Sequence, residues 1–134
     1  MRVVVIDGQG GRMGRLVVEK IRAEQLPCEI VAVGTNAIAT SEMLKAGADV
    51  GATGENPVIV ACRSADIIVG PLGIAIADSL LGEISPAMAN AVAASNAHRV
   101  LIPMNLCNTY VAGVSAGASA VIADAMDHIR TLIK

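Results

Sequence analysis

The apolar and polar positions of this chain follow two different periods along its length. Short runs of β-branched residues, such as RVVVI at 2–6 and EIVAV at 29–33, predict strands that are covered on both faces. Longer segments place apolar residues at helical spacing, as at Met13, Leu16 and Ile21. Because strand and helix patterns alternate, the sequence predicts a parallel sheet with right-handed crossovers and helices on both faces.

Caps, prolines and glycines set the bounds of the expected elements. Strands are expected at Arg2–Ile6, Glu29–Val33, Asp49–Thr53, Asp66–Val69, Arg99–Ile102 and, as a sixth, Thr109–Val114. Helices are expected at Arg12–Gln25, from Thr40 or Ser41 to Ala46, from Asn56-Pro57 to Arg63, at Ile74–Leu81, from Ser85-Pro86 to Ala94, and at Ser119–Leu132. The predicted fold class is therefore α/β, a single Rossmann-like domain over residues 1–134 with a doubly wound parallel sheet in three layers.

Composition agrees with one folded domain and argues against several classes of protein. A chain of 134 residues supports one core, and 54% apolar against 16% charged residues excludes disorder. Ten basic and twelve acidic residues, with one Tyr as the whole aromatic content, argue against a nucleic-acid partner. The uncharged stretch Val100–Ala123 contains Pro, Asn, Gly and Ser, so it favours strand, turn and helix over a membrane span.

The cysteines bear on the expected compartment. Cys28, Cys62 and Cys107 form no CxxC pair and are odd in number, which argues against a disulfide or zinc framework. The first strand begins at Arg2 and leaves no room for a signal peptide. We therefore expect a cytoplasmic protein with no metal site and no membrane partner.

The sharpest chemical signal is the segment GQGGRMGR, which directly follows the first strand and opens the first helix. It reads as GxxGxxG and departs from GxGxxG because Met13 stands at the third glycine. Glycines let the backbone approach a phosphate, and the helix start offers free N–H groups and a positive dipole end. Arg12 and Arg15 add charge. The residues expected to contact a phosphorylated ligand are Gly8, Gln9, Gly10, Gly11, Arg12, Met13 and Gly14. The alternative is a glycine turn that merely joins strand to helix.

Three further segments follow strands and so belong to the same edge of the sheet. Thr35 and Asn36 stand where an NAD-binding protein usually places an acidic residue, and they are neutral partners for a ribose. A second glycine turn faces the same crevice if the strand order is 3-2-1-4-5; its residues are Gly70, Pro71, Leu72 and Gly73. Asn105 carries an amide that can bond a ligand. For each segment the alternative is an ordinary turn or a loop whose own backbone is satisfied.

Catalytic residues are not assigned by the sequence. Asp78 and Glu83 are weak candidates for an acid–base pair, with a helix cap or a solvated face as the stronger interpretation. Cys107 is a weak candidate nucleophile because no histidine is placed convincingly beside it.

Two resemblances are visible. The segment Gly8–Arg15, with RVVVI before it and LVVEKI after it, resembles the opening of dihydrodipicolinate reductase and other two-domain reductases, over about the first third of the chain. The stretches GQGGRMG, GPLGIAIADSLLGEISPAMANAV and IPMNLCNTYVAGV resemble a family of short bacterial proteins of unknown function. The second resemblance implies a fold but no reaction. The substrate half of the reductases has no counterpart here, since His98 and His128 are isolated.

The leading hypothesis is a nucleotide-binding protein, for NAD(P) or another phosphorylated small molecule, that acts as a sensor, carrier or subunit. The alternatives are a small oxidoreductase or transferase whose site another subunit completes, and a scaffold that has lost its ligand. We expect Gly11→Val to abolish binding and leave the fold intact. The low charge content and the alanine-rich helices predict a homo-oligomer, with an interface at the helix after Ser119 or the helix after Ser85.

Overall fold

The structure is a computed structural model that describes residues 1–104, 108–114 and 117–133. Its elements in chain order are β1 (Arg2–Asp7), α1 (Arg12–Ala23), β2 (Glu29–Gly34), α2 (Ala37–Lys45), β3 (Val50–Thr53), α3 (Glu55–Ser64), β4 (Ile67–Pro71), the 3-10 helix η1 (Leu72–Ala75), α4 (Pro86–Ala94), β5 (His98–Ile102) and α5 (Ala118–Leu132). Each strand is followed by a helix, as the alternating pattern predicts.

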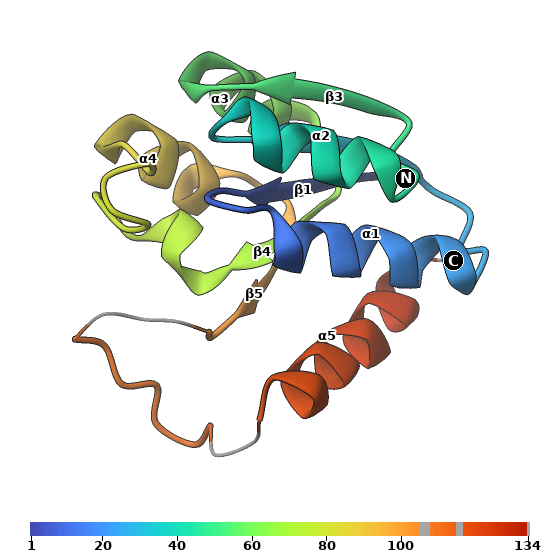
Figure 1. Ribbon diagram of the computed structural model, residues 1–134. Helices are drawn as coiled ribbons and strands as arrows, with labels where there is room; N and C mark the ends of the chain where they lie inside the picture. Colours follow the sequence, from blue (N-terminus) through green and yellow to red (C-terminus); the bar gives the residue numbers. More distant parts are fainter. Residues whose placement is uncertain (105–107, 115–116, 134) are drawn as a thin grey trace.

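The five strands form one parallel sheet in the order β3-β2-β1-β4-β5. Central strand β1 places Val5 opposite Ala32 of β2 on one side and Val69 of β4 on the other. This order confirms the α/β, doubly wound fold class. It also makes β1 and β4 neighbours although α1, β2, α2, β3 and α3 separate them in the chain (Figure 1).

Alternate residues of β1 face two separate cores, one on each side of the sheet. Val3 and Val5 belong to a cluster with α1, α5 and Met43 of α2. Val4 and Ile6 belong to a second cluster with residues of α3 and α4. All four β1 side chains are fully buried, which is why the strand is an unbroken apolar run. Figure 1 shows α1 and α5 on one side of the sheet and α4 on the other, so the three-layer arrangement is present.

The structure corrects the predictions for two segments. The helix expected at Ile74–Leu81 is absent: η1 ends at Ala75, and the residues up to the start of α4 form a compact series of turns. In that turn the φ angles of Asp78, Leu80 and Leu81 are positive, a conformation that no right-handed helix contains. The strand expected at Thr109–Val114 is also absent, since described residues 108–114 form turns beside no strand partner.

Smaller corrections concern element boundaries. Helix α2 begins earlier than expected because the side chain of Asn36, and not Thr40 or Ser41, caps it by accepting from the N–H of Ala39. Helix α3 is preceded by Gly54 rather than capped by Asn56. No helix in the described ranges combines the length and apolarity needed to cross a bilayer.

Candidate functional site

A crevice lies at the carboxyl ends of β1 and β4, from which the chain departs in opposite directions, toward β2 and toward β5. In open parallel sheets this is the place where ligands bind. We call residues 8–14, between β1 and the first turn of α1, the glycine loop. A cavity of about 350 Å³ opens beside it, and Gln9 of the loop lines this cavity together with Pro71 and Gly73. The predicted approach of the two glycine segments is therefore present.

Asp7, the last residue of β1, fixes the shape of the glycine loop. One oxygen of its buried carboxylate accepts from the N–H of Gly8 at 2.8 Å, and the other accepts from the N–H of Gly14 at 2.7 Å. The carboxylate thus ties the two ends of the loop together. Burial raises the pKa of Asp7 above its ordinary value, and the nearby charge of Glu83 adds a smaller increase. The hydrogen bonds from the N–H groups of Gly14 and Gly8 lower this pKa, but by less than burial raises it.

Glu83 crosses the crevice and joins the glycine loop to the end of β2. Its Oε1 accepts from the N–H of Gln9 at 2.9 Å, from the hydroxyl of Thr35 at 2.5 Å and from the amide of Asn36 at 2.9 Å. Partial burial acts to raise the pKa of Glu83, but these three hydrogen bonds outweigh it and lower that pKa. Glu83 is therefore an ionised group in the middle of the candidate site.

Part of the loop remains available to a ligand. Within the described part of the chain, the N–H groups of Gly10, Arg12 and Met13 donate to no acceptor, and no side chain caps α1. The exposed guanidinium of Arg12 has no hydrogen-bond or ion-pair partner there either. Arg15, by contrast, is paired with Glu19 at 3.0 Å and Glu42 at 3.2 Å. Of the two arginines proposed from the sequence, Arg12 is the one whose charge is free.

The glycines of the loop differ in what surrounds them. A Cβ added to Gly10 would have no atom within 4 Å, so the backbone is open to solvent there. Gly11 has a φ of +72°, and a Cβ on it would lie 2.7 Å from the Cα of Ala39 in α2. The expectation that Gly11→Val leaves the fold intact is therefore wrong. The valine side chain would clash with α2, and a β-branched residue is strained at this positive φ.

The other predicted residues divide into those near the loop and those elsewhere. Thr35 and Asn36 lie at the loop, joined to it through Glu83. Gly70 and Pro71 are the last residues of β4 and not part of a turn, a difference of two residues from the expected strand. Met13 is half-buried and packs against the core, and Leu72 lines a different hollow. Asn105 and Cys107 lie outside the described residues.

Sequence reasoning missed Asp7, and it named Glu83 only as a weak acid–base candidate and not as a residue that bonds to the glycine loop. Asp7 gave a signal, since it is the acidic end of an otherwise apolar buried strand. Glu83 gave a weaker one, because its partners are 47, 48 and 74 residues away in the chain. Only the folding of residues 76–83 over the loop brings those groups together.

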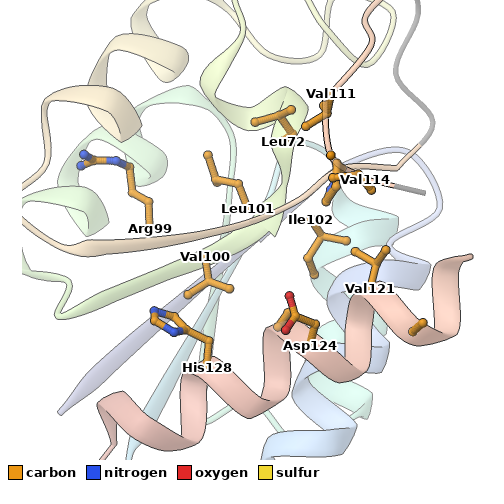
Figure 2. Close-up of a pocket in the computed structure, with 14 residues that line it drawn as sticks. Leu72, Arg99, Val100, Leu101, Ile102, Val111, Val114, Val121, Asp124 and His128 are labelled. Atoms are coloured by element: carbon orange, nitrogen blue, oxygen red, sulfur yellow. The ribbon is translucent and has the colours of Figure 1, made fainter. Parts of the chain in front are cut away.

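A larger hollow of about 560 Å³ lies between β5 and α5 (Figure 2). Figure 2 shows Val100, Ile102 and Val121 directed into it, with Asp124 and His128 along α5. Its lining is mostly aliphatic, and none of the glycine-loop residues takes part. The smaller crevice is the better candidate site because it adjoins the glycine loop through Gln9, and the loop carries free N–H donors and is bonded to Glu83.

The sheet order and the glycine loop at its switch point define a small α/β protein with a doubly wound parallel sheet and a crevice beside the loop. The chain belongs to the family described as a domain of unknown function, DUF3842, whose model matches residues 2–134. This confirms the expected membership in a family of unknown function. No curated protein matches the chain.

One solved structure with a similar shape is the crystal structure of a dodecameric FMN-dependent UbiX-like decarboxylase from Escherichia coli O157:H7. It is 18% identical, the match covers 98% of this chain and 76% of that one, and the TM-score is 0.49. A likeness of this size carries no argument about ligand, reaction or assembly.

Proposed function

We propose that this protein binds a nucleotide, NAD(P) in the first instance, with a phosphate group on the glycine loop, and acts as a sensor, carrier or subunit. The observation that carries the proposal is the set of unused donors at the start of α1. Among the described residues, the backbone N–H groups of Arg12 and Met13 in the first turn of α1, and of Gly10 just before it, have no acceptor, and no side chain caps the helix. Such groups bind anions, and the helix dipole favours negative charge at the same place.

Two further features support a phosphate at this position. The free guanidinium of Arg12 stands at the start of the same helix, and arginine is well suited to phosphate because it presents several N–H donors. Gly10 leaves the backbone uncovered, so a phosphate can reach the amides without meeting a Cβ. The resemblance in sequence between GQGGRMG and the loop that opens two-domain reductases is the reason that NAD(P) is proposed first. Among the described residues no acid–base set with a substrate position supports a catalytic role, and the proposal includes no reaction.

The first test is thermal unfolding of the protein with NAD, NADP, FAD and ATP in turn. A nucleotide present at 100 times its Kd should add about 2.7 kcal/mol to the free energy of unfolding. Gly10→Val should remove this stabilisation and leave the melting temperature of the empty protein unchanged, because its side chain enters open space. The matched control is Gly117→Val, a second glycine with open surroundings, far from the loop in sequence. If Gly10→Val binds as tightly as the parent, the phosphate does not sit on the loop.

The second test concerns the charge of Arg12. We expect Arg12→Ala to weaken the binding of the nucleotide by about 1.5–3 kcal/mol, the loss of a charge-assisted hydrogen bond. Arg63→Ala, which removes another exposed arginine on α3, is the control and should leave affinity unchanged. Calorimetric titration measures both. Equal affinities for the two variants would contradict the placement of the phosphate beside Arg12.

A further inference from the structure

We propose that Glu83 accepts hydrogen bonds from the ribose hydroxyls of the bound nucleotide, so that the site takes nucleotides with a free 2′-hydroxyl and rejects those with a 2′-phosphate. This inference rests on the proposed nucleotide function and specifies its ligand. It would make Glu83 a residue that determines specificity.

The first step is the position of the carboxylate. Dinucleotide-binding folds hold the ribose with an acidic residue near the end of the second strand. This chain has Thr35 and Asn36 at that place, and neither is acidic. The carboxylate of Glu83 is hydrogen-bonded to both of them. Glu83, from the segment after β4, therefore places a negative charge at the end of β2, where the residues that follow β2 in the chain are neutral.

The second step is that the segment carrying Glu83 is held in one shape. The N–H of Asp78 donates to the carbonyl of Ile84, and the N–H of Ile84 donates to the carbonyl of Ser79. The hydroxyl of Ser79 donates back to the carbonyl of Gly73. Non-glycine residues with positive φ at 78, 80 and 81 persist only where surrounding contacts impose them, and they cluster at binding sites. Glu83 is thus presented to the loop by a constrained turn.

The third step is the bonding capacity that remains. Oε1 of Glu83 takes three donors, whereas Oε2 accepts from no group within the described residues. A carboxylate offers about four acceptor positions, so Oε2 can take ribose hydroxyls without breaking the contacts to the loop. Gln9, which donates to Glu83, is next in sequence to Gly10 with its free N–H. The free acceptor for a ribose diol, on Glu83, and a free donor for a phosphate, on Gly10, are thus connected through Gln9.

The fourth step is the local charge, which opposes a 2′-phosphate. A phosphate beside Glu83 would meet a carboxylate of the same sign. Of the two arginines at the start of α1, Arg15 is already paired with Glu19 and Glu42, and Arg12 is assigned to the nucleotide's other phosphate. The site therefore lacks a spare cation for a 2′-phosphate among the described residues near the loop.

The test is a calorimetric titration of the parent and of Glu83→Gln with NAD and with NADP. We expect the parent to bind NAD at least tenfold more tightly than NADP. Glu83→Gln should lose roughly tenfold in affinity for NAD and most of the preference between the two, since the bond to a charged acceptor is gone. Glu55→Gln, at an exposed glutamate that begins α3, is the control and should keep the preference.

A second measurement separates recognition from a merely structural role. The parent should bind AMP more tightly than 2′-deoxyadenosine 5′-monophosphate, and Glu83→Gln should bind the two equally. The inference is overturned if the parent binds NADP as tightly as NAD, or if Glu83→Gln binds NAD as tightly as or more tightly than the parent. Tighter binding would mean that Glu83 occupies the place of a ligand anion. If the parent binds no nucleotide, the proposed function fails together with this inference, whereas a parent that binds NAD and NADP equally tightly overturns only the inference.

Discussion

Gly10 and Gly11 are adjacent in the chain, but the structure constrains only Gly11. Gly11 combines a φ of +72° with contact to the backbone of α2, so its lack of a side chain belongs to the folding of the loop. Gly10 has neither constraint, so its lack of a side chain matters only to something that approaches from outside. A motif that is uniform in sequence thus contains one glycine that the fold requires and one that the fold leaves unconstrained.

We therefore predict that Gly11→Val destabilises the protein by more than 2 kcal/mol, because the new side chain would lie inside contact distance of Ala39 and the valine would have to adopt a positive φ. Urea unfolding followed by circular dichroism measures the loss. Gly10→Val is the matched control, with the same side chain one position earlier and an expected change below about 0.5 kcal/mol. Equal stabilities for the two variants would contradict the assigned roles.

At the residue scale, the sequence located the loop but not the groups that bond to it. Glycines beside a strand end and a helix start are a local signal, and the loop lies where that signal predicts. The role of Gly11 was misjudged because the helix it contacts, α2, begins only after the next strand. Glu83 was not assigned to the loop because no local pattern predicts which side chain a constrained turn will present 47 residues from its partner.

Among the elements, α4 is the one whose start is most clearly encoded. Ser85 accepts from the N–H of Met88 at 3.2 Å, and Pro86 occupies the first helical position. This cap directly follows Glu83 and Ile84, so it also anchors the end of the constrained turn. The prediction of a helix from Ser85-Pro86 to Ala94 is confirmed for this reason.

We predict that Ser85→Ala lowers the free energy of unfolding by about 1 kcal/mol, the usual cost of losing a side-chain cap. The melting temperature should fall by roughly 3–5 °C for a domain of this size. Ser119→Ala is the control: this exposed serine lies within α5 and not at its cap, so its replacement should change stability little. A Ser85→Ala variant as stable as the control would show that α4 does not depend on the cap.

The two elements that the sequence predicts and the structure lacks, a helix at 74–81 and a strand at 109–114, are absent for related reasons. Residues 74–81 contain apolar residues at helical spacing. Hydrogen bonds from Ser79 to Gly73 and from Ile84 to Ser79 nevertheless hold them in a series of turns that is incompatible with a continuous helix. Residues 109–114 are largely apolar and resemble a strand, but they do not pair with the open edge of β5, whose one partner among the described residues is β4. In both cases tertiary contacts, not local propensity, determine the outcome.

At the scale of the whole molecule, the remaining question is assembly. Helix α5, one of the two helices expected at an interface, buries one face in its own chain through Ile122, Met126 and Ile129. Its other face exposes small residues such as Ala123. Large apolar side chains are also exposed elsewhere, with Leu81 at 93% and Tyr110 at 86%. Together with the low charge content of the chain, these exposed side chains are the basis on which association is predicted.

We predict that the protein is a homo-oligomer in solution, with a mass at least twice the 13.6 kDa of one chain. Light scattering at micromolar concentration measures it. Ala123→Arg on α5 and Ala87→Arg on α4 place a charge on the two candidate interface helices, and one of them should lower the mass. A parent mass near 13.6 kDa would contradict the prediction, and an oligomer that both variants leave intact would contradict the choice of helices.

The bridging of the glycine loop by Asp7 has a consequence for how a ligand would bind. Because this carboxylate closes the loop through bonds within the chain, the conformational entropy of ordering the loop is lost during folding and not on association. Binding then resembles the docking of two rigid bodies, with little reorganisation of the backbone. Hydrogen exchange in the ligand-free protein would reveal this state, with slow exchange at the amides of Gly8 and Gly14 and fast exchange at Gly10 between them.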